Sequence, residues 1–220
     1  MPPIDLSPLG ISLRVALLAT LISGLAGVLT AYRFYRRPGR HPALADTLLL
    51  SPMLLPPTVV GLLLLLLFGR RGLLGPALET LGLPLVFTWQ AAMVAAAIVA
   101  FPLVYRAARG AFEQLDPQLL DAARLDGAPE LDVLLHIALP LARPGLLAGL
   151  LLAYARALGE FGATLMVAGN IPGQTQTIPL AIYLATETGA TGVALFWAAV
   201  AAMLCLGGVF LGRWLGRSPL

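Results

Sequence analysis

Arg156 and Glu160 are the two residues of this chain whose types and spacing first suggest chemistry. They lie four positions apart in the segment RALGEFGATLMVAGNIPG, which is otherwise made of apolar and small residues. On a continuous helix this spacing puts both side chains on one face, where they can form an ion pair. Two interpretations follow: the pair fixes one conformation of a hinge or gate, or it is a structural ion pair that stabilises a crowded helix crossing.

Small and polar residues around the pair extend the candidate site. Gly159 and Gly162 allow a second helix to approach closely, or the chain to bend. Asn170 lies in GNIPGQTQT, whose composition is typical of a turn-rich connection. The candidate pathway or gate residues are therefore Arg156, Gly159, Glu160, Gly162, Thr164 and Asn170.

Composition indicates which elements position these residues. The chain has 220 residues, of which 59% are hydrophobic and only 11% charged, and its mean hydropathy is +0.88. A soluble domain carries about 25% charged residues. An ionisable group at membrane depth costs about 2.5–3.5 kcal/mol to insert, and less when it is paired or faces water. The fold class predicted is an all-α integral membrane protein.

Apolar stretches long enough to cross a bilayer, which takes about 20 helical residues, define the predicted spans. We expect five, within a single transmembrane domain over residues 1–220, at about 11–32, 47–68, 86–106, 143–165 and 193–213. The second stretch contains Pro52, Pro56 and Pro57, so we expect it to be kinked or broken.

Several functions are excluded by missing residue types. All 14 basic residues are arginine, and a P-loop needs a lysine for its phosphates, so the chain carries no nucleotide site of that kind. Cys205 is the single cysteine and has no disulfide partner within the chain. His41 and His136 lie far apart without ligand spacing. We therefore expect no catalytic residue, no metal and no cofactor, and we expect no nucleic-acid partner.

Arginine distribution predicts the orientation. Most arginines cluster in the first loop, in the loop after the third span and in the tail: Arg33, Arg36, Arg37, Arg40, Arg106, Arg109, Arg124, Arg143, Arg213 and Arg217. The other side carries only Arg14, Arg70 and Arg71. By the positive-inside rule the N-terminus lies outside and the C-terminus in the cytoplasm, as five spans require.

The most polar segment is about 106–142, on the predicted cytoplasmic side. Pro117 and Pro129 stand where a helix can begin, and Gly127 between them suits a turn. This pattern predicts a short helix, a glycine turn and a second short helix that leads to Pro140 and the fourth span.

Within this segment the chain resembles a known family. LDAARLDGAPELDVLLHIALP matches the EAA loop of permease subunits from binding-protein-dependent ABC importers, in which EAA is followed by three residues, a glycine, nine residues and I-x-L-P. The matching positions are Asp121, Ala122, Ala123, Gly127, Ile137, Leu139 and Pro140. The one departure is Asp121 in place of glutamate, which keeps the charge but shortens the side chain.

Other segments resemble the molybdate importer permeases within that family: residues 155–183, LPPTVVG at 55–61 and GRRGLLG at 69–75. The resemblance implies a type I importer permease fold in the lipid of the inner membrane. It implies a pore made by two copies of this chain, two ATP-binding cassette ATPase subunits that hydrolyse ATP, and an external oxyanion-binding protein. The EAA loop at 116–140 would be the coupling helix that docks on the ATPase, and residues 170–173 would lie at the outer end of the pathway or form a plain connector.

Alternatives remain open at this stage. Tungstate and sulfate permeases share the GEFG pattern, so either ion could be the substrate. A proton-coupled secondary transporter could use Glu160 as a relay, and a non-transporting scaffold or receptor is a third class, but neither explains the EAA spacing. Arg70, Arg71 and Arg156 could attract an oxyanion, although tight binding would trap it; Arg70 and Arg71 could equally dock acidic groups of the binding protein.

Overall fold

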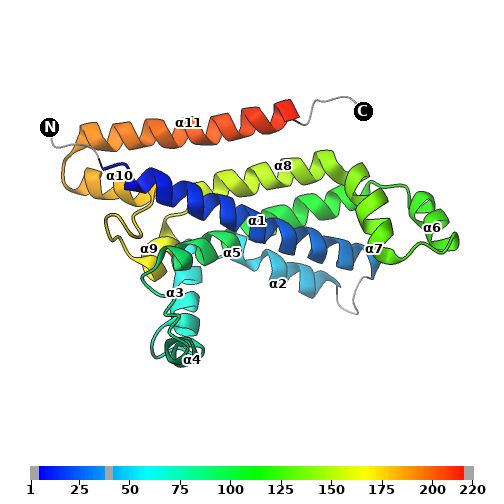
Figure 1. The fold of residues 1–220 in the computed structure, drawn as a ribbon, viewed down its shortest axis with the longest axis horizontal. Coiled ribbons are helices and arrows are strands. Elements are labelled where there is room, and N and C mark those ends of the chain that lie inside the picture. Colours follow the sequence, from blue (N-terminus) through cyan, green and yellow to red (C-terminus); the bar gives the residue numbers. More distant parts are fainter. Residues whose placement is uncertain (1–4, 38–41, 216–220) are drawn as a thin grey trace.

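The computed structural model describes residues 5–37 and 42–215, and this part of the chain is helical with no strand (Figure 1). The helices are α1 (Ser7–Arg36), α2 (Pro42–Leu54), α3 (Pro57–Phe68), α4 (Gly75–Thr80), α5 (Trp89–Glu113), α6 (Pro117–Leu125), α7 (Glu130–Asp132), the π-helical turn η1 (Val133–Ala138), α8 (Leu139–Leu158), α9 (Gly162–Ala168), α10 (Ile178–Glu187) and α11 (Thr191–Leu215). The fold class predicted from the sequence is confirmed.

Helices α1, α5 and α8 form the centre of the molecule, side by side in Figure 1. They pack closely because small residues line their contacts. A Cβ atom on Gly27 would lie 2.9 Å from Cβ of Val104, and one on Gly149 would lie 2.6 Å from Cβ of Ala107. Apolar helices gain no hydrophobic energy by leaving lipid for each other, so close backbone approach is the main way for them to gain contact energy.

Four helices are long and apolar enough to cross a membrane: Ser7–Arg36, Trp89–Glu113, Glu130–Leu158 and Thr191–Phe210. The bent pair Ala43–Leu54 and Pro57–Phe68 raises the number to five if it is one span. Its two helices meet at 104°, which confirms the predicted break. The amide of Leu55 still bonds to Ser51, but the prolines at 56 and 57 have no amide hydrogen to continue the helix. In Figure 1, α3 runs almost perpendicular to α2, with α4 near its far end.

The fourth predicted span, over 143–165, is broken between Gly159 and Gly162, the two glycines for which a bend was one of the predicted outcomes. Helix α8 ends at Leu158, and α9 begins only at Gly162. At its other end the span begins earlier than predicted, because α7, η1 and α8 run on as one helix over Glu130–Leu158. The second arm of the predicted hairpin is therefore the start of a long helix. The π-helical turn directly precedes α8, whose first residues include Pro140.

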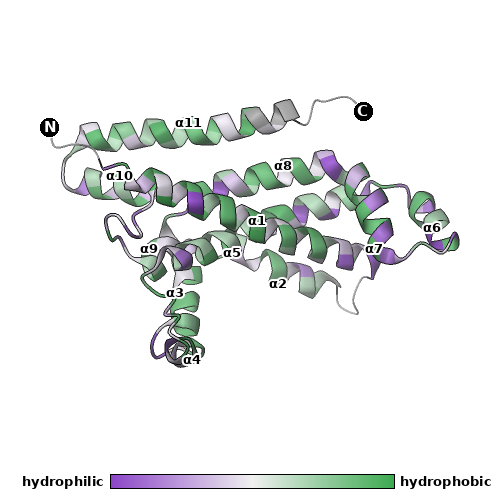
Figure 2. Cartoon of the chain, in the orientation of Figure 1, coloured by the Kyte–Doolittle hydropathy of each residue, from purple (hydrophilic) through white to green (hydrophobic). Residues whose placement is uncertain are grey.

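The two ends of the bundle differ in character (Figure 2). We call the end with α6 and α7 the loop end, and the end with α9 and α10 the opposite end. Polar residues gather at the loop end, whereas α3 and α11 are apolar over most of their length. Helix α11 packs on α10 and on α8, where Gly208 faces the ring of Tyr154, but only 11% of its span is buried.

Candidate functional site: the loop end and the Arg156–Glu160 junction

Helix α6 has clear start and stop signals in the sequence. Asp116 is its N-cap and accepts a hydrogen bond from the amide of Gln118 at 2.9 Å, and Pro117 is its first residue. After the helix, Gly127 has a φ of +86°, and nothing lies within 4 Å of the place of a Cβ atom. The left-handed backbone conformation is therefore what calls for glycine here, as the sequence predicted.

The seven EAA positions divide between an exposed and a packed set. Asp121, Ala122, Gly127 and Pro140 are exposed. Ala123, Ile137 and Leu139 are partly buried and pack in one hydrophobic cluster with residues of α1 and α5. The structure thus brings the two halves of the motif together at the loop end, and each half has both exposed and packed positions.

One face of α6 carries exposed apolar side chains. Leu119 is 52% exposed and Leu125 is 88% exposed, and Ala122 lies between them at a spacing of three residues. We call Leu119, Ala122 and Leu125 the α6 stripe. On the other face, Leu120 is 1% exposed and anchors the helix to the bundle. The α6 stripe is thus an exposed apolar surface at the polar end of the molecule (Figure 2).

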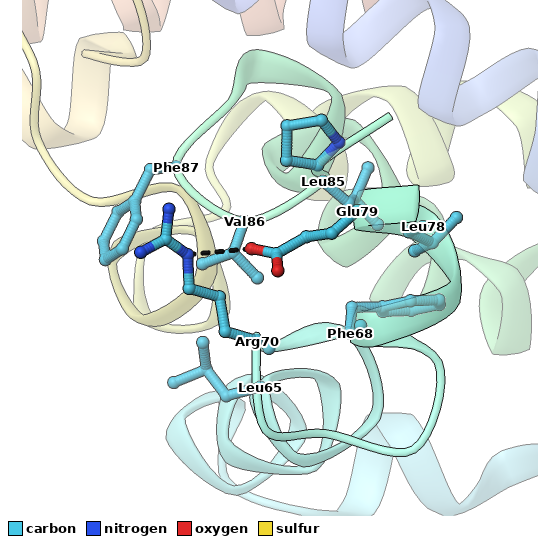
Figure 3. Close-up of a pocket in the computed structure, with 11 residues that line it drawn as sticks. Leu65, Phe68, Arg70, Leu78, Glu79, Leu85, Val86 and Phe87 are labelled. Carbon is cyan, nitrogen blue, oxygen red and sulfur yellow. Dashed lines mark ion pairs between the residues drawn. The ribbon is translucent and has the colours of Figure 1, made fainter. Parts of the chain in front are cut away.

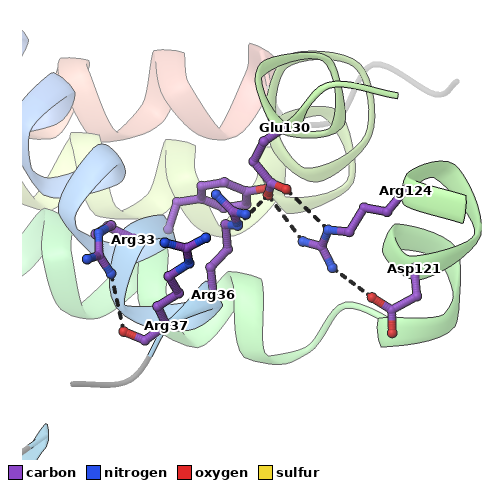
Figure 4. Close-up of polar contacts among 7 residues, drawn as sticks. Arg33, Arg36, Arg37, Asp121, Arg124 and Glu130 are labelled. Carbon is purple, nitrogen blue, oxygen red and sulfur yellow. Dashed lines mark hydrogen bonds and ion pairs between the residues drawn. The ribbon is translucent and has the colours of Figure 1, made fainter. Parts of the chain in front are cut away.

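An ionic network beside α6 was not predicted from the sequence (Figure 4). Glu130 receives three donors: the hydroxyl of Tyr32 at 2.5 Å, Nε of Arg36 at 2.6 Å, and Arg124 through Nε and Nη2 at 3.2 Å each. Arg124 also pairs with Asp121 at 2.7 Å. The hydrogen bond to Glu130 is the main cause that raises the pKa of Arg124, so this guanidinium stays charged at any physiological pH.

A second network at the loop end ties α2 to α5 and was also missed. Nη1 of Arg109 lies 2.5 Å from Oδ1 of Asp46, and Nε of the same arginine lies 2.8 Å from Glu113. The hydroxyl of Tyr105 donates to Asp46 as well. The Arg109–Glu113 spacing was readable from the sequence, but Asp46 is 63 positions away and gave no signal.

Arg156 and Glu160 form the predicted pair, but across a helix end. Nη1 of Arg156, in the last turn of α8, lies 2.7 Å from Oε2 of Glu160, which follows the C-cap residue Gly159. Oε1 of Glu160 accepts a hydrogen bond from the amide of Ala163 at 2.9 Å, in the first turn of α9. The Glu160 side chain is 1% exposed. One carboxylate therefore joins the end of α8 to the start of α9, where a negative charge also suits the helix dipole.

The other candidates surround this junction in different ways. A Cβ atom on Gly162 would lie 3.0 Å from Cβ of Pro57, so α9 passes close to the start of α3. Gly159 has no such neighbour and serves only the helix end. Thr164 and Asn170 each bury an oxygen, Oγ1 and Oδ1, that has no hydrogen-bond partner among the described residues.

The GNIPGQTQT segment is an ordered part of the opposite end. The amides of Gln174, Thr175 and Gln176 all bond to the carbonyl oxygen of Ile171, and residues 175–177 are buried. Directly after it, the amide of Ile178 donates to the hydroxyl of Ser12 at 2.7 Å, which fixes α10 to the start of α1.

Arg70 is paired within the chain rather than free (Figure 3). Its Nε lies 2.8 Å from Oε1 of Glu79, beside a largely apolar pocket of about 470 Å³ between α3, α4 and residues 84–87. Arg14 lies over the ring of Trp89, 5.2 Å from its centroid, at a second pocket of about 350 Å³. The described residues provide no carboxylate partner for Arg14.

The fold and the loop end define an integral membrane transport component. A model of the family described as "Binding-protein-dependent transport system inner membrane component" matches residues 23–218. The chain belongs to this family, so it is a permease subunit of an ABC transporter and not an enzyme, and it is a multi-pass protein of the inner membrane.

Relatives extend over nearly the whole chain. The putative molybdenum transport system permease protein YvgM of Bacillus subtilis (strain 168) is 45% identical over 192 residues, which cover 87% of this chain and 85% of the relative. The molybdenum transport system permease protein ModB of Escherichia coli (strain K12) is 42% identical over 210 residues, covering 94% and 91%. A solved structure of a bacterial alginate ABC transporter with its periplasmic protein has a TM-score of 0.74 at 17% identity, covers 100% of this chain and 82% of that one, and so confirms the importer permease fold.

Proposed function

We propose that this chain, over residues 1–220, is the permease subunit of an ATP-driven molybdate importer. Two copies form the translocation pore, two ATPase subunits bind below it, and an external oxyanion-binding protein delivers the substrate. The N-terminus lies outside and the C-terminus in the cytoplasm, which places the loop end beside the ATPases. ATP binding closes the ATPase pair and, through the loop, turns the pore toward the binding protein.

The observation that carries this proposal is the outward face of α6. The α6 stripe and the exposed Asp121 lie together at the loop end, on a helix fixed from behind by Leu120. A short helix with apolar residues and a flanking carboxylate suits a groove that is apolar at its base and basic at its rim. A cleft in an ATPase subunit is the partner that the EAA resemblance implies.

The orientation rests on the arginines. Arg33, Arg36, Arg37, Arg109 and Arg124 all lie at the loop end, whereas Arg70 and Arg71 lie between α3 and α4, toward the opposite end. The positive-inside rule then places the loop end in the cytoplasm. Arg40 and Arg217 lie outside the described residues.

Molybdate is the substrate favoured by the relatives, since both YvgM and ModB carry molybdenum transport in their names. Tungstate and sulfate are the alternatives, because they are also tetrahedral dianions. Competition among the three ions for the cognate binding protein would rank them. Preferential binding of sulfate would overturn the assignment of the substrate while leaving the permease role intact.

A proton-coupled mechanism through Glu160 fits the geometry less well. A relay carboxylate must exchange protons with water, whereas the Glu160 side chain is buried, paired with Arg156 and bonded to the amide of Ala163. The pathway roles of Gly159, Gly162, Thr164 and Asn170 remain part of the proposal: they lie at the junction between α8 and α9, within α9 and directly after it, where the pore wall can bend.

Uptake into proteoliposomes tests the proposal. The chain is reconstituted with its ATPase and binding protein, and labelled molybdate is supplied on the side of the binding protein. We expect uptake that needs both partners and internal ATP. Uptake driven by a pH gradient without ATP would overturn the proposal, and so would a chain that does not associate with the ATPase.

A further inference from the structure

We infer that Glu130 is a positioning residue that connects the docking helix α6 to α1, so that a movement of α6 is passed to the far end of the membrane domain. The inference rests on the proposed function, because α6 must be moved by a partner. It assigns a role to a residue outside the seven EAA positions, on the basis of contacts that no motif describes.

Side chains from α1 and α6 meet at the carboxylate of Glu130. Its Oε1 atom accepts the hydroxyl hydrogen of Tyr32 and pairs with Nε of Arg36, both from α1. The same carboxylate takes two hydrogen bonds from Arg124, which belongs to α6. Figure 4 shows Arg36 and Arg124 reaching this group from opposite sides. One carboxylate thus holds side chains from two separate helices.

The residues that bind Glu130 are themselves held by further contacts. Arg124 is bonded to Asp121, on the exposed side of α6, where a partner would push. The ring of Tyr32 is buried and packs edge-on against Phe112 of α5, with centroids 5.3 Å apart. A displacement of α6 therefore acts on α1 through short, charge-assisted contacts between ordered groups.

Helix α1 is the element that extends this connection across the molecule. Its 30 residues give a rod of about 45 Å. At the other end of the rod, Ser12 accepts the hydrogen bond from the amide of Ile178, next to the GNIPGQTQT segment. Helix α1 is thus held near both of its ends: by Glu130 at the loop end, and by the hydrogen bond of Ser12 at the opposite end.

A purely stabilising role does not explain the network well. The side chains of Arg36, Arg124 and Glu130 are 28%, 33% and 26% exposed. Ion pairs with partial access to water contribute only modestly to stability. Three residues that donate to one carboxylate instead fix the relative position of α1 and α6, the helices that carry them.

The test uses the complete reconstituted complex and the factor by which loaded binding protein stimulates ATP hydrolysis. Glu130→Gln is expected to lower this factor about fivefold or more, in the range of ordinary coupling energies, while the ATPase still co-purifies. Glu187→Gln is the matched control, because it makes the same chemical change at an exposed position at the end of α10, away from the loop end. The control is expected to behave as wild type.

A double-mutant cycle tests whether the α1 contacts and the α6 contacts act together through Glu130 or independently of each other. The paired change Tyr32→Phe with Arg36→Gln removes both α1 contacts to Glu130, and Arg124→Gln removes the α6 contacts. If both sets act through Glu130, the combined variant loses no more stimulation than the worse of the two. Losses that multiply, or a Glu130→Gln complex with wild-type stimulation, would overturn the inference. The Tyr32→Phe, Arg36→Gln variant keeps the test decisive if Glu130→Gln does not assemble, since wild-type stimulation in that variant also refutes the role of Glu130. A wild-type chain without ATP-driven uptake would instead refute the proposed function.

Discussion

Arg156 and Glu160 are joined by an ion pair of 2.7 Å although the helix that carries the arginine ends between them. The carboxylate has two partners, the guanidinium on α8 and the amide of Ala163 on α9. The pair therefore fixes the angle between two helices, rather than bracing one helix along its side.

Replacing Glu160 by glutamine tests this junction. The amide oxygen of glutamine can still accept from Ala163, but the charge opposite Arg156 is lost. We expect the free energy of unfolding to fall by about 1–3 kcal/mol and ATP-driven uptake to fall strongly. Thermal unfolding in detergent and uptake in proteoliposomes measure the two effects. Glu187→Gln, at an exposed position at the end of α10, is the control; wild-type uptake by Glu160→Gln would show that the pair has no part in transport.

Gly127 is the residue whose backbone sets the return of the chain after α6. Valine at this position must adopt a φ of +86°, which a β-branched residue resists at a cost of about 1–2 kcal/mol or more. We expect Gly127→Val to insert into the membrane normally but to lose coupling between hydrolysis and uptake. Gly82→Val carries the same kind of strain, at φ +69°, on the connection after α4, and should leave coupling intact. Unchanged coupling in Gly127→Val would count against the docking role of the loop.

The α6 stripe makes a prediction about affinity. Leu119→Asp and Leu125→Asp place a charge on side chains that are at least half exposed, so the stability of the chain should stay near wild type. Binding of the ATPase should weaken about tenfold or more for each, equivalent to about 1.4 kcal/mol. Surface-coupled permease titrated with ATPase subunits measures this. Leu131→Asp, exposed but outside the stripe, is the comparison; equal losses in all three would mean that the stripe is not the contact.

The crossing of α3 and α9 depends on Gly61. A Cβ atom there would lie 2.6 Å from Cβ of Met166, closer than side-chain atoms approach each other. We expect Gly61→Val to separate the helices and to lower the free energy of unfolding by about 1–3 kcal/mol. Thermal unfolding and limited proteolysis near residues 69–75 would detect it. Gly192→Val, where no atom lies within 4 Å, controls for the β-branched residue in an apolar helix.

Local signals predicted much of the loop end. Pro117 at the start of α6 and Gly127 after it act within a few residues, so their effect is visible in the sequence. The network at Glu130 was hidden because Tyr32 is 98 positions away, and only packing brings them together. The helix break at residue 159 was only one of two expectations, because Gly159 and Gly162 suit a bend or a close crossing and the spacing of Arg156 and Glu160 fits a continuous helix equally well.

The weak attachment of α11 bears on how the protein is made. Its span is 11% buried, and it rests on α8 through the notch at Gly208. The contacts among α1, α5 and α8 do not involve it. Because α11 leaves the ribosome after α1, α5 and α8, we expect those three helices to assemble during synthesis, with α11 added to a bundle that is already formed.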